Sequence, residues 1–162
     1  MKIAIITARG GSKRILRKNI KNFLGKPIIV YSIETAINSN LFDKVIVSTD
    51  DEEIKDISIK FGAEVPFLRS EKNSDDYATT IDVVREVMNK LSSEYNEFCC
   101  IYPTAPFITC SKLINSYKLF KENNGDFCIP VTRFSYPAQR CLVKNKNLIR
   151  FEREEFEKYR SQ

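Results

Sequence analysis

The sequence predicts an α/β protein, built as a doubly wound, mainly parallel sheet with helices on both faces. Short apolar runs alternate with amphipathic runs of helix length along the chain, and this βαβα alternation is typical of such sheets. With 162 residues, 43% of them hydrophobic, the chain can bury one core of ordinary domain size. No repeat, low-complexity tract or linker divides it. We therefore expect a single domain over residues 1–162.

Five apolar runs have the length of buried strands. They are KIAII (2–6), KVIVS (44–48), AEVPFL (63–68), FCCIY (98–102) and DFCIPV (126–131). Between them, helices are expected to begin at Pro27, at Asp51, at Thr79 or Thr80, and at Thr109, with Gly62 ending the second. The apolar positions expected to face the core are Ile29, Ile33, Ala36 and Ile37, then Ile54, Ile57 and Phe61, then Ile81, Val84, Met88, Leu91 and Tyr95. The tail RFEREEFEKYRSQ (150–162) is predicted to be a solvated segment; the alternative is that its Phe151 and Phe156 pack.

Positive charge is concentrated near the start of the chain. The first 30 residues contain eight Lys and Arg residues and no Asp or Glu, and five of the cations lie in TARGGSKRILRKNI (7–20). A field this local suits a discrete polyanionic ligand better than a long nucleic-acid track. No apolar run approaches the ~20 residues needed to span a bilayer, and no secretory leader pattern follows the first methionine. We expect a cytoplasmic protein that binds neither nucleic acid nor membrane.

The cysteine and histidine content excludes several kinds of site. The five cysteines are an odd number without a CxxC pair, and histidine is absent, so neither a disulfide frame nor a zinc site is supported. We interpret the cysteines as small buried apolar residues. Without histidine, catalysis cannot use an imidazole base.

Ligands of doubly wound sheets bind beyond the carboxyl ends of the strands, here the loops 7–19, 48–51, 68–79, 102–109 and 131–140. The first loop matches neither GxGxxG nor GxxxxGK[ST], which argues against a dinucleotide site and a P-loop. Its two glycines, Gly10 and Gly11, would still let backbone N–H groups approach phosphate oxygens. Arg9 adds a planar fork, and Lys13 or Lys18 adds a point charge. The loop is therefore predicted to hold phosphates; the alternative is a solvated basic turn.

Six motifs occur together in a recognisable order: ARGGSKRILRKNI, LGKPIIVYSIETA, VIVSTDDEEI, FGAEVPFLR, DDYATT and YPTAP. In order and spacing they resemble the acylneuraminate cytidylyltransferases, which activate nine-carbon ulosonic acids as CMP-sugars. YPTAPF and KYRSQ resemble most the members that act on pseudaminic acid. The resemblance implies a Rossmann-like fold of the nucleotide-diphospho-sugar transferase type. It also implies transfer of CMP from CTP to an anomeric hydroxyl with release of pyrophosphate, a Mg²⁺ cofactor and a homodimer.

The resemblance also implies roles for particular residues. Those matching nucleotide-binding positions are Ala8, Arg9, Gly10, Gly11, Ser12, Lys13, Asn19, Arg69, Thr80 and Thr104. Arg9 and Lys18 would stabilise charge on the leaving pyrophosphate. Tyr102, Gln139 and Arg140 match positions near the sugar acid. The alternatives are ordinary: Asn19 as a cap, Arg69 as a solvated loop residue and Gln139 as part of a turn.

The metal ligands are the part of the site that the sequence leaves undefined. In the family the Mg²⁺-binding aspartates lie in a C-terminal segment, and this chain ends at Gln162 before any counterpart. Asp50 and Asp51 could substitute, although capping of the following helix is the preferred reading. We therefore expect the 162-residue chain to bind CTP and to release little pyrophosphate. Two alternatives stay open: another CMP-sugar synthetase of the sialic, legionaminic or Kdo type, and a non-catalytic CTP-binding fragment.

Overall fold

The computed structural model describes residues 1–91, 95–133, 141–145, 148–153 and 155. The chain forms two compact units, Met1–Asp126 and Phe127–Gln162. In the part of the chain described, no helix is long and apolar enough to cross a membrane.

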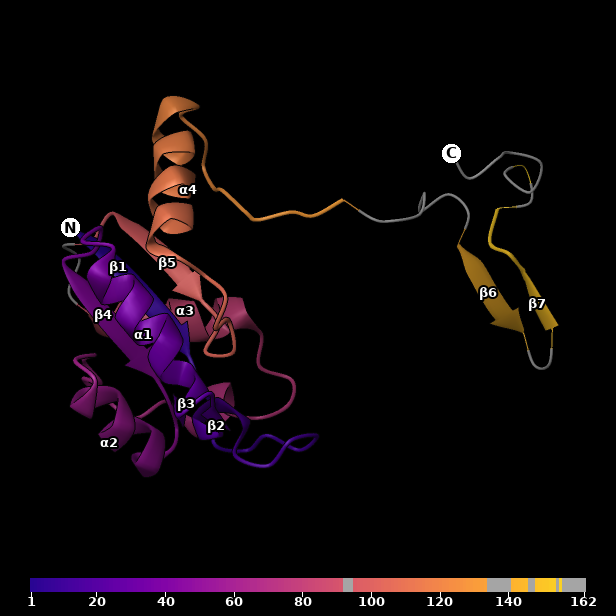
Figure 1. The fold of residues 1–162 in the computed structure, drawn as a ribbon. Helices are drawn as coiled ribbons and strands as arrows, with labels where there is room; N and C mark the ends of the chain where they lie inside the picture. Colours follow the sequence, from indigo (N-terminus) through magenta and orange to yellow (C-terminus); the bar gives the residue numbers. More distant parts are fainter. Residues whose placement is uncertain (92–94, 134–140, 146–147, 154, 156–162) are drawn as a thin grey trace. The chain divides into compact units, whose positions relative to one another are not determined.

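The first unit is built on a parallel sheet of three strands (Figure 1). They are β1 (Lys2–Thr7), β4 (Lys44–Ser48) and β5 (Glu97–Ile101), in the order β4-β1-β5, with Ile5 of β1 opposite Ile46 on one side and Cys100 on the other. From β1 the chain passes first to one side of the sheet and later to the other. The carboxyl end of β1 is therefore the point at which the strand order reverses, where such sheets bind ligands.

Helices cover both faces of this sheet, as predicted. Ala4 and Ile6 of β1 face a core shared with α1 (Ile28–Asn38), α2 (Glu52–Lys60) and α4 (Cys110–Glu122). Ile3 and Ile5 point to the opposite face and pack against α3 (Thr80–Lys90). Because successive strand side chains point to opposite faces, the apolar run of β1 serves both cores. In Figure 1, α1 crosses in front of the sheet and α3 lies behind it.

The predicted helix starts are confirmed within one residue. Asp51 caps α2 by accepting a hydrogen bond from the Ile54 amide at 3.0 Å. Thr79 forms a capping box with Asp82, and Thr109 caps α4. Pro27 precedes the first helical residue instead of being it. Gly62, with φ of +91°, ends α2 as expected.

Short elements join these parts of the first unit. They are the 3-10 turns η1 (Lys18–Ile20) and η2 (Glu71–Asn73) and the strand pair β2 (Asn22–Phe23) and β3 (Lys26–Pro27). The β2–β3 turn contains Gly25, whose φ of +97° favours glycine.

Two of the predicted strands are wrong. Residues 63–68 make only isolated bridges, from Glu64 to Ile46 and from Leu68 to Thr49. Pro66 between them has no N–H to donate, which interrupts a ladder. Residues 126–131 form no strand in the described chain, and Phe127 and Val131 are exposed. Their apolar pattern is that of a strand, but no partner strand lies beside them among the described residues.

Several predicted burial positions are also wrong. Ile37 and Ile81 are exposed because they lie off the core-facing side of their helices, which Val30, Val83 and Val87 occupy instead. Cys128 and Cys141 are exposed and the other three cysteines are half-buried, so the predicted burial of all five is wrong. No disulfide joins any of these cysteines in the described chain. In the second unit an antiparallel hairpin, β6 (Leu142–Asn145) and β7 (Leu148–Phe151), takes up the start of the predicted solvated tail.

Candidate functional site

A cleft of about 220 Å³ opens at the carboxyl ends of β1 and β5, beside the basic loop. This volume is slightly smaller than the ~300 Å³ of the smallest usual small-molecule pockets. The cleft therefore has room for only part of a ligand the size of a nucleotide. Eight predicted site residues line it: Arg9, Ser12, Lys18, Asn19, Arg69, Thr80, Tyr102 and Thr104. Seven of them come from three of the five loops that the sheet topology indicated, and Thr80 begins α3.

The remaining predicted residues lie elsewhere. Ala8 is buried in the core beneath the loop, and Lys13 is exposed and paired with Asp76. Gly10 and Gly11 belong to the loop without lining the cleft. Gln139 and Arg140 lie outside the described residues.

The two glycines of the basic loop have different surroundings. The Gly10 amide donates to Asp50 Oδ1 at 3.0 Å, so in this structure it binds a carboxylate. A Cβ at Gly10 would lie 2.5 Å from Asp51 Oδ2, which only glycine avoids, whereas a Cβ at Gly11 would meet nothing within 4 Å. Close approach of the two chain segments therefore requires glycine at position 10 alone.

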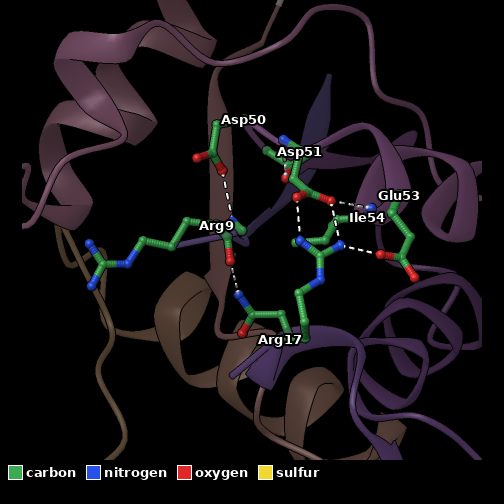
Figure 2. Close-up of polar contacts among 9 residues, drawn as sticks. Arg9, Arg17, Asp50, Asp51, Glu53 and Ile54 are labelled. Atoms are coloured by element: carbon green, nitrogen blue, oxygen red, sulfur yellow. Dashed lines mark hydrogen bonds and ion pairs between the residues drawn. The ribbon is translucent and has the colours of Figure 1, made fainter. Parts of the chain in front are cut away.

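Figure 2 shows a cluster of charged side chains in which Arg17 of the basic loop contacts Asp51 and Glu53. The Arg17 guanidinium donates to both carboxylate oxygens of Asp51, at 2.5 and 2.8 Å, and also to Glu53. This pairing holds the pKa of Asp51 below its usual range. Asp51 therefore caps α2, as predicted. Asp50 does not cap this helix; its Oδ1 accepts the hydrogen bond from the Gly10 amide.

Arg69 is buried, with 7% of its surface exposed, so the reading as a solvated loop residue is wrong. Its Nε donates to Ser48 Oγ at 3.1 Å, and its Nη2 donates to the carbonyl of Ala8 at 2.9 Å and to that of Ser48. Burial lowers the pKa of this guanidinium. Arg69 therefore ties the ends of β1 and β4 together, and these bonds leave Nη1 as the nitrogen able to contact a ligand.

Asn19 has an unusual environment. It is 3% exposed, and its Nδ2 donates to the Arg9 carbonyl at 2.9 Å instead of capping a turn. Its Oδ1 is buried and has no hydrogen-bond partner among the described residues. A buried acceptor left unpaired is costly, and here it belongs to a side chain that lines the cleft. The arrangement indicates a place for a ligand donor.

Two carboxylates that the sequence pattern did not indicate as site residues, Asp75 and Asp76, also line the cleft. Arg9 Nη1 donates to the Asp75 carbonyl at 2.8 Å and lies 3.0 Å from the Asp76 carboxylate, which also pairs with Lys13. Lys13, followed by Arg9, lowers the pKa of Asp76. The DDYATT motif carried these residues, but only the fold shows that they face the basic loop.

The segment bearing η2 is held to α3 through Glu86. This carboxylate accepts hydrogen bonds from the Ser70 amide at 3.0 Å, from Ser70 Oγ at 2.9 Å, from Asn73 at 2.5 Å and from Lys90 at 2.7 Å. Burial by itself would raise the pKa of Glu86, but these bonds together lower it to about 2. Asn73, which lines the cleft, is positioned by this contact.

The described residues do not by themselves fit a protein-held Mg²⁺. They contain no group of three or more Asp, Glu, Cys or His side chains placed to hold a metal. Asp51 is engaged by Arg17, Asp76 by Arg9 and Lys13, and Asp50 by Gly10.

Comparison with known proteins finds cytidylyltransferases among the proteins similar to this chain. A family model described as cytidylyltransferase matches residues 3–160. A pseudaminic acid cytidylyltransferase of Campylobacter jejuni is 48% identical over 148 residues, covering 90% of this chain and 64% of that protein. An N-acylneuraminate cytidylyltransferase of Escherichia coli is 36% identical over 138 residues, covering 85% of this chain and 32% of that protein.

Solved structures share the fold. A CMP:2-keto-3-deoxy-manno-octonic acid synthetase, determined with CTP, superposes with a TM-score of 0.66 at 24% identity, over 76% of this chain and 48% of its own. A cytidylyltransferase from Leptospira borgpetersenii gives a TM-score of 0.63 at 23% identity, over 76% and 50%. The chain thus spans 64% of the length of the C. jejuni relative and about half of each solved chain.

Proposed function

Because the chain belongs to the cytidylyltransferase family, we propose that it binds CTP in the cleft beside the basic loop and transfers CMP to a nine-carbon ulosonic acid. The anomeric hydroxyl oxygen forms a bond to the α-phosphorus. The bond from that phosphorus to the α–β bridging oxygen breaks, pyrophosphate leaves, and the hydroxyl proton passes to solvent. Such a reaction needs positioning and charge neutralisation more than a strong base, in agreement with the absence of histidine.

The observation that carries this proposal is the buried Oδ1 of Asn19, which has no hydrogen-bond partner in the described part of the chain and lies in a cleft that also holds Arg9 and Lys18. Cytosine presents an amino group where uracil presents a carbonyl, so an acceptor at this depth favours cytosine. The Arg69 Nη1 group is a second candidate for the base. Arg9 and Lys18 would neutralise the triphosphate and the charge that moves onto pyrophosphate.

Tyr102 and Thr104 are proposed to lie between nucleotide and sugar. The Tyr102 hydroxyl is 3.4 Å from Thr80 Oγ1, and the ring is exposed at the cleft, where an acceptor sugar would approach. Gln139 and Arg140 stay predictions for the sugar acid. Pseudaminic acid is the favoured acceptor, supported by the 48% identity to the C. jejuni enzyme of that name.

We also propose a Mg²⁺ cofactor, a cytoplasmic location and a homodimer. Mg²⁺ commonly binds through one or two carboxylates together with substrate phosphates, so it could enter with CTP; its chemistry would be to neutralise phosphate charge. A cytoplasmic location agrees with five free thiols. A homodimer stays a prediction.

The test is calorimetric titration of the chain with CTP, with and without Mg²⁺, using Arg9→Ala and Lys2→Ala. Charge-assisted phosphate contacts are worth ~1.5–3 kcal/mol, so Arg9→Ala should weaken CTP binding by roughly tenfold or more. Lys2 begins β1 at the opposite end of the strand, where its ammonium lies over the Tyr117 ring, so its loss should have little effect. Equal weakening by both substitutions would indicate a diffuse field and contradict a specific phosphate site.

Pyrophosphate release is then measured with pseudaminic, sialic, legionaminic and Kdo acids in turn. Release with pseudaminic acid alone supports the favoured acceptor, and a preference for another acid assigns the chain to that synthetase type. CTP binding without release for any acid would support the non-catalytic alternative.

A further inference from the structure

We propose that Arg17 is a positioning residue, which clamps the basic loop to the start of α2 and so holds Lys18 and Asn19 in the cleft. The inference rests on the proposed function for its ligand, CTP. It assigns a cation of the loop to the architecture of the site instead of to the phosphates.

Arg17 makes its contacts outside the cleft. Arg17 is not among the residues lining the cleft, although its neighbour Lys18 is. Its guanidinium forms a bidentate hydrogen-bonded contact with Asp51 and donates a third hydrogen bond to Glu53 (Figure 2). All three hydrogen bonds thus go to carboxylates. The hydrogen bonds to Asp51, together with the negative charge of that carboxylate, raise the pKa of Arg17, so the guanidinium stays charged.

Two adjacent carboxylates hold the two ends of one loop. Asp50 accepts the amide of Gly10 at 3.0 Å, and Asp51 binds Arg17 at 2.5 and 2.8 Å. The segment 10–17 between them contains Ser12 and the exposed cations Lys13 and Arg14. Asp51 also caps α2, a helix that packs in the core. The contact with Arg17 therefore fixes the loop to this helix.

The backbone at Arg17 connects the clamp to the cleft. Its φ of 52° and ψ of 35° lie in the left-handed region, which few residues other than glycine adopt and which persists only where the surroundings impose it. The next residues form η1, which carries Lys18 and Asn19. If the backbone at Arg17 left this conformation, Lys18 and Asn19 would therefore move within the cleft.

The test compares Arg17→Asn, Arg17→Lys, Asp51→Asn and the double variant Arg17→Asn/Asp51→Asn with wild type. Asparagine tolerates the left-handed conformation, so Arg17→Asn removes the clamp without adding backbone strain, and Asn at position 51 can still cap α2. The matched control is Arg14→Ala, which removes an exposed cation of the same loop. CTP affinity is measured by calorimetry, and amide exchange of residues 10–19 is followed without ligand.

We expect Arg17→Asn to weaken CTP binding roughly tenfold, with Arg17→Lys in between because a lysine keeps the charge but not the fork. The double variant should bind no more weakly than Arg17→Asn, since both changes break one contact. Arg14→Ala should stay within about twofold of wild type. Amide exchange of residues 10–19 should accelerate in Arg17→Asn, in Asp51→Asn and in the double variant, and should stay at the wild-type rate in Arg14→Ala.

Three results would overturn the inference. One is equal loss of affinity in Arg14→Ala and Arg17→Asn, which means a diffuse field. Another is a lowered melting temperature of Arg17→Asn with unchanged CTP affinity, which means a purely structural role. The third is unchanged amide exchange in Arg17→Asn. If wild type does not bind CTP, the proposed function fails, and the exchange measurement still decides whether the clamp exists.

Discussion

The choice of base should depend on Asn19. In Asn19→Ala the side chain loses both the acceptor Oδ1, which is buried and unpaired among the described residues, and the 2.9 Å hydrogen bond from Nδ2 to the Arg9 carbonyl. The first loss concerns the base alone. The second loosens the loop and affects any nucleotide.

The expected magnitude follows from this separation. Pairing a buried acceptor with a ligand donor is worth ~1–3 kcal/mol, and the lost bond to Arg9 costs a further ~0.5–1.5 kcal/mol for CTP and UTP alike. Only the first contribution distinguishes the two nucleotides. Because 1.4 kcal/mol is a factor of ten, the preference of wild type for CTP should fall roughly 5- to 150-fold in Asn19→Ala.

Calorimetric titration of both nucleotides, at one salt and Mg²⁺ concentration, measures this ratio. Asn22→Ala is the control, because Asn22 lies outside the cleft and its Oδ1 accepts the Gly25 amide at 3.0 Å. The control should keep the wild-type preference. Equal binding of CTP and UTP by wild type, or an unchanged ratio in Asn19→Ala, would refute the assignment of base recognition to this amide.

Two further predictions concern stability. Glu86→Gln should lower the free energy of unfolding by ~1–3 kcal/mol at pH 7. Folding lowers the pKa of Glu86 to about 2. The stabilisation by the ionised Glu86 is therefore fully present above about pH 4.5 and is lost as the pH falls toward 2. Urea unfolding at pH 7 and pH 3 checks this, and a difference from wild type that is equal at both pH values would contradict it. Gly10→Ala should destabilise the protein by ~1–3 kcal/mol because its methyl group would lie 2.5 Å from Asp51 Oδ2, which Arg17 holds in place. Gly11→Ala, with open space around it, should change stability by no more than ~0.5 kcal/mol, and similar thermal shifts for the two variants would show that the close approach at Gly10 is wrong.

What the sequence by itself determined is mainly local. Three strands and four helices followed from periodicity, and the caps Asp51, Thr79 and Thr109 followed from residue type, because each depends on neighbours a few positions away. The edge of the sheet where the cleft opens also followed from the sequence, because βαβ connections place the carboxyl ends of parallel strands together. Residues 63–68 and 126–131 show where this reasoning stops: an apolar pattern allows a strand, but only a partner makes one.

Only the tertiary structure decided which partner each polar group takes. Arg9 meets Asp75 across 66 positions, and Arg17 meets Asp51 across 34, so no local pattern indicates that one cation faces the cleft and the other a helix cap. Arg69 could have been a solvated residue, but it is buried at the ends of β1 and β4. There it donates a hydrogen bond to the Ala8 carbonyl, which lies 61 positions away in the sequence. The physical reason is that a charged side chain is stabilised by whatever the fold places within hydrogen-bond reach, and at these separations the packing of the whole sheet sets that neighbourhood.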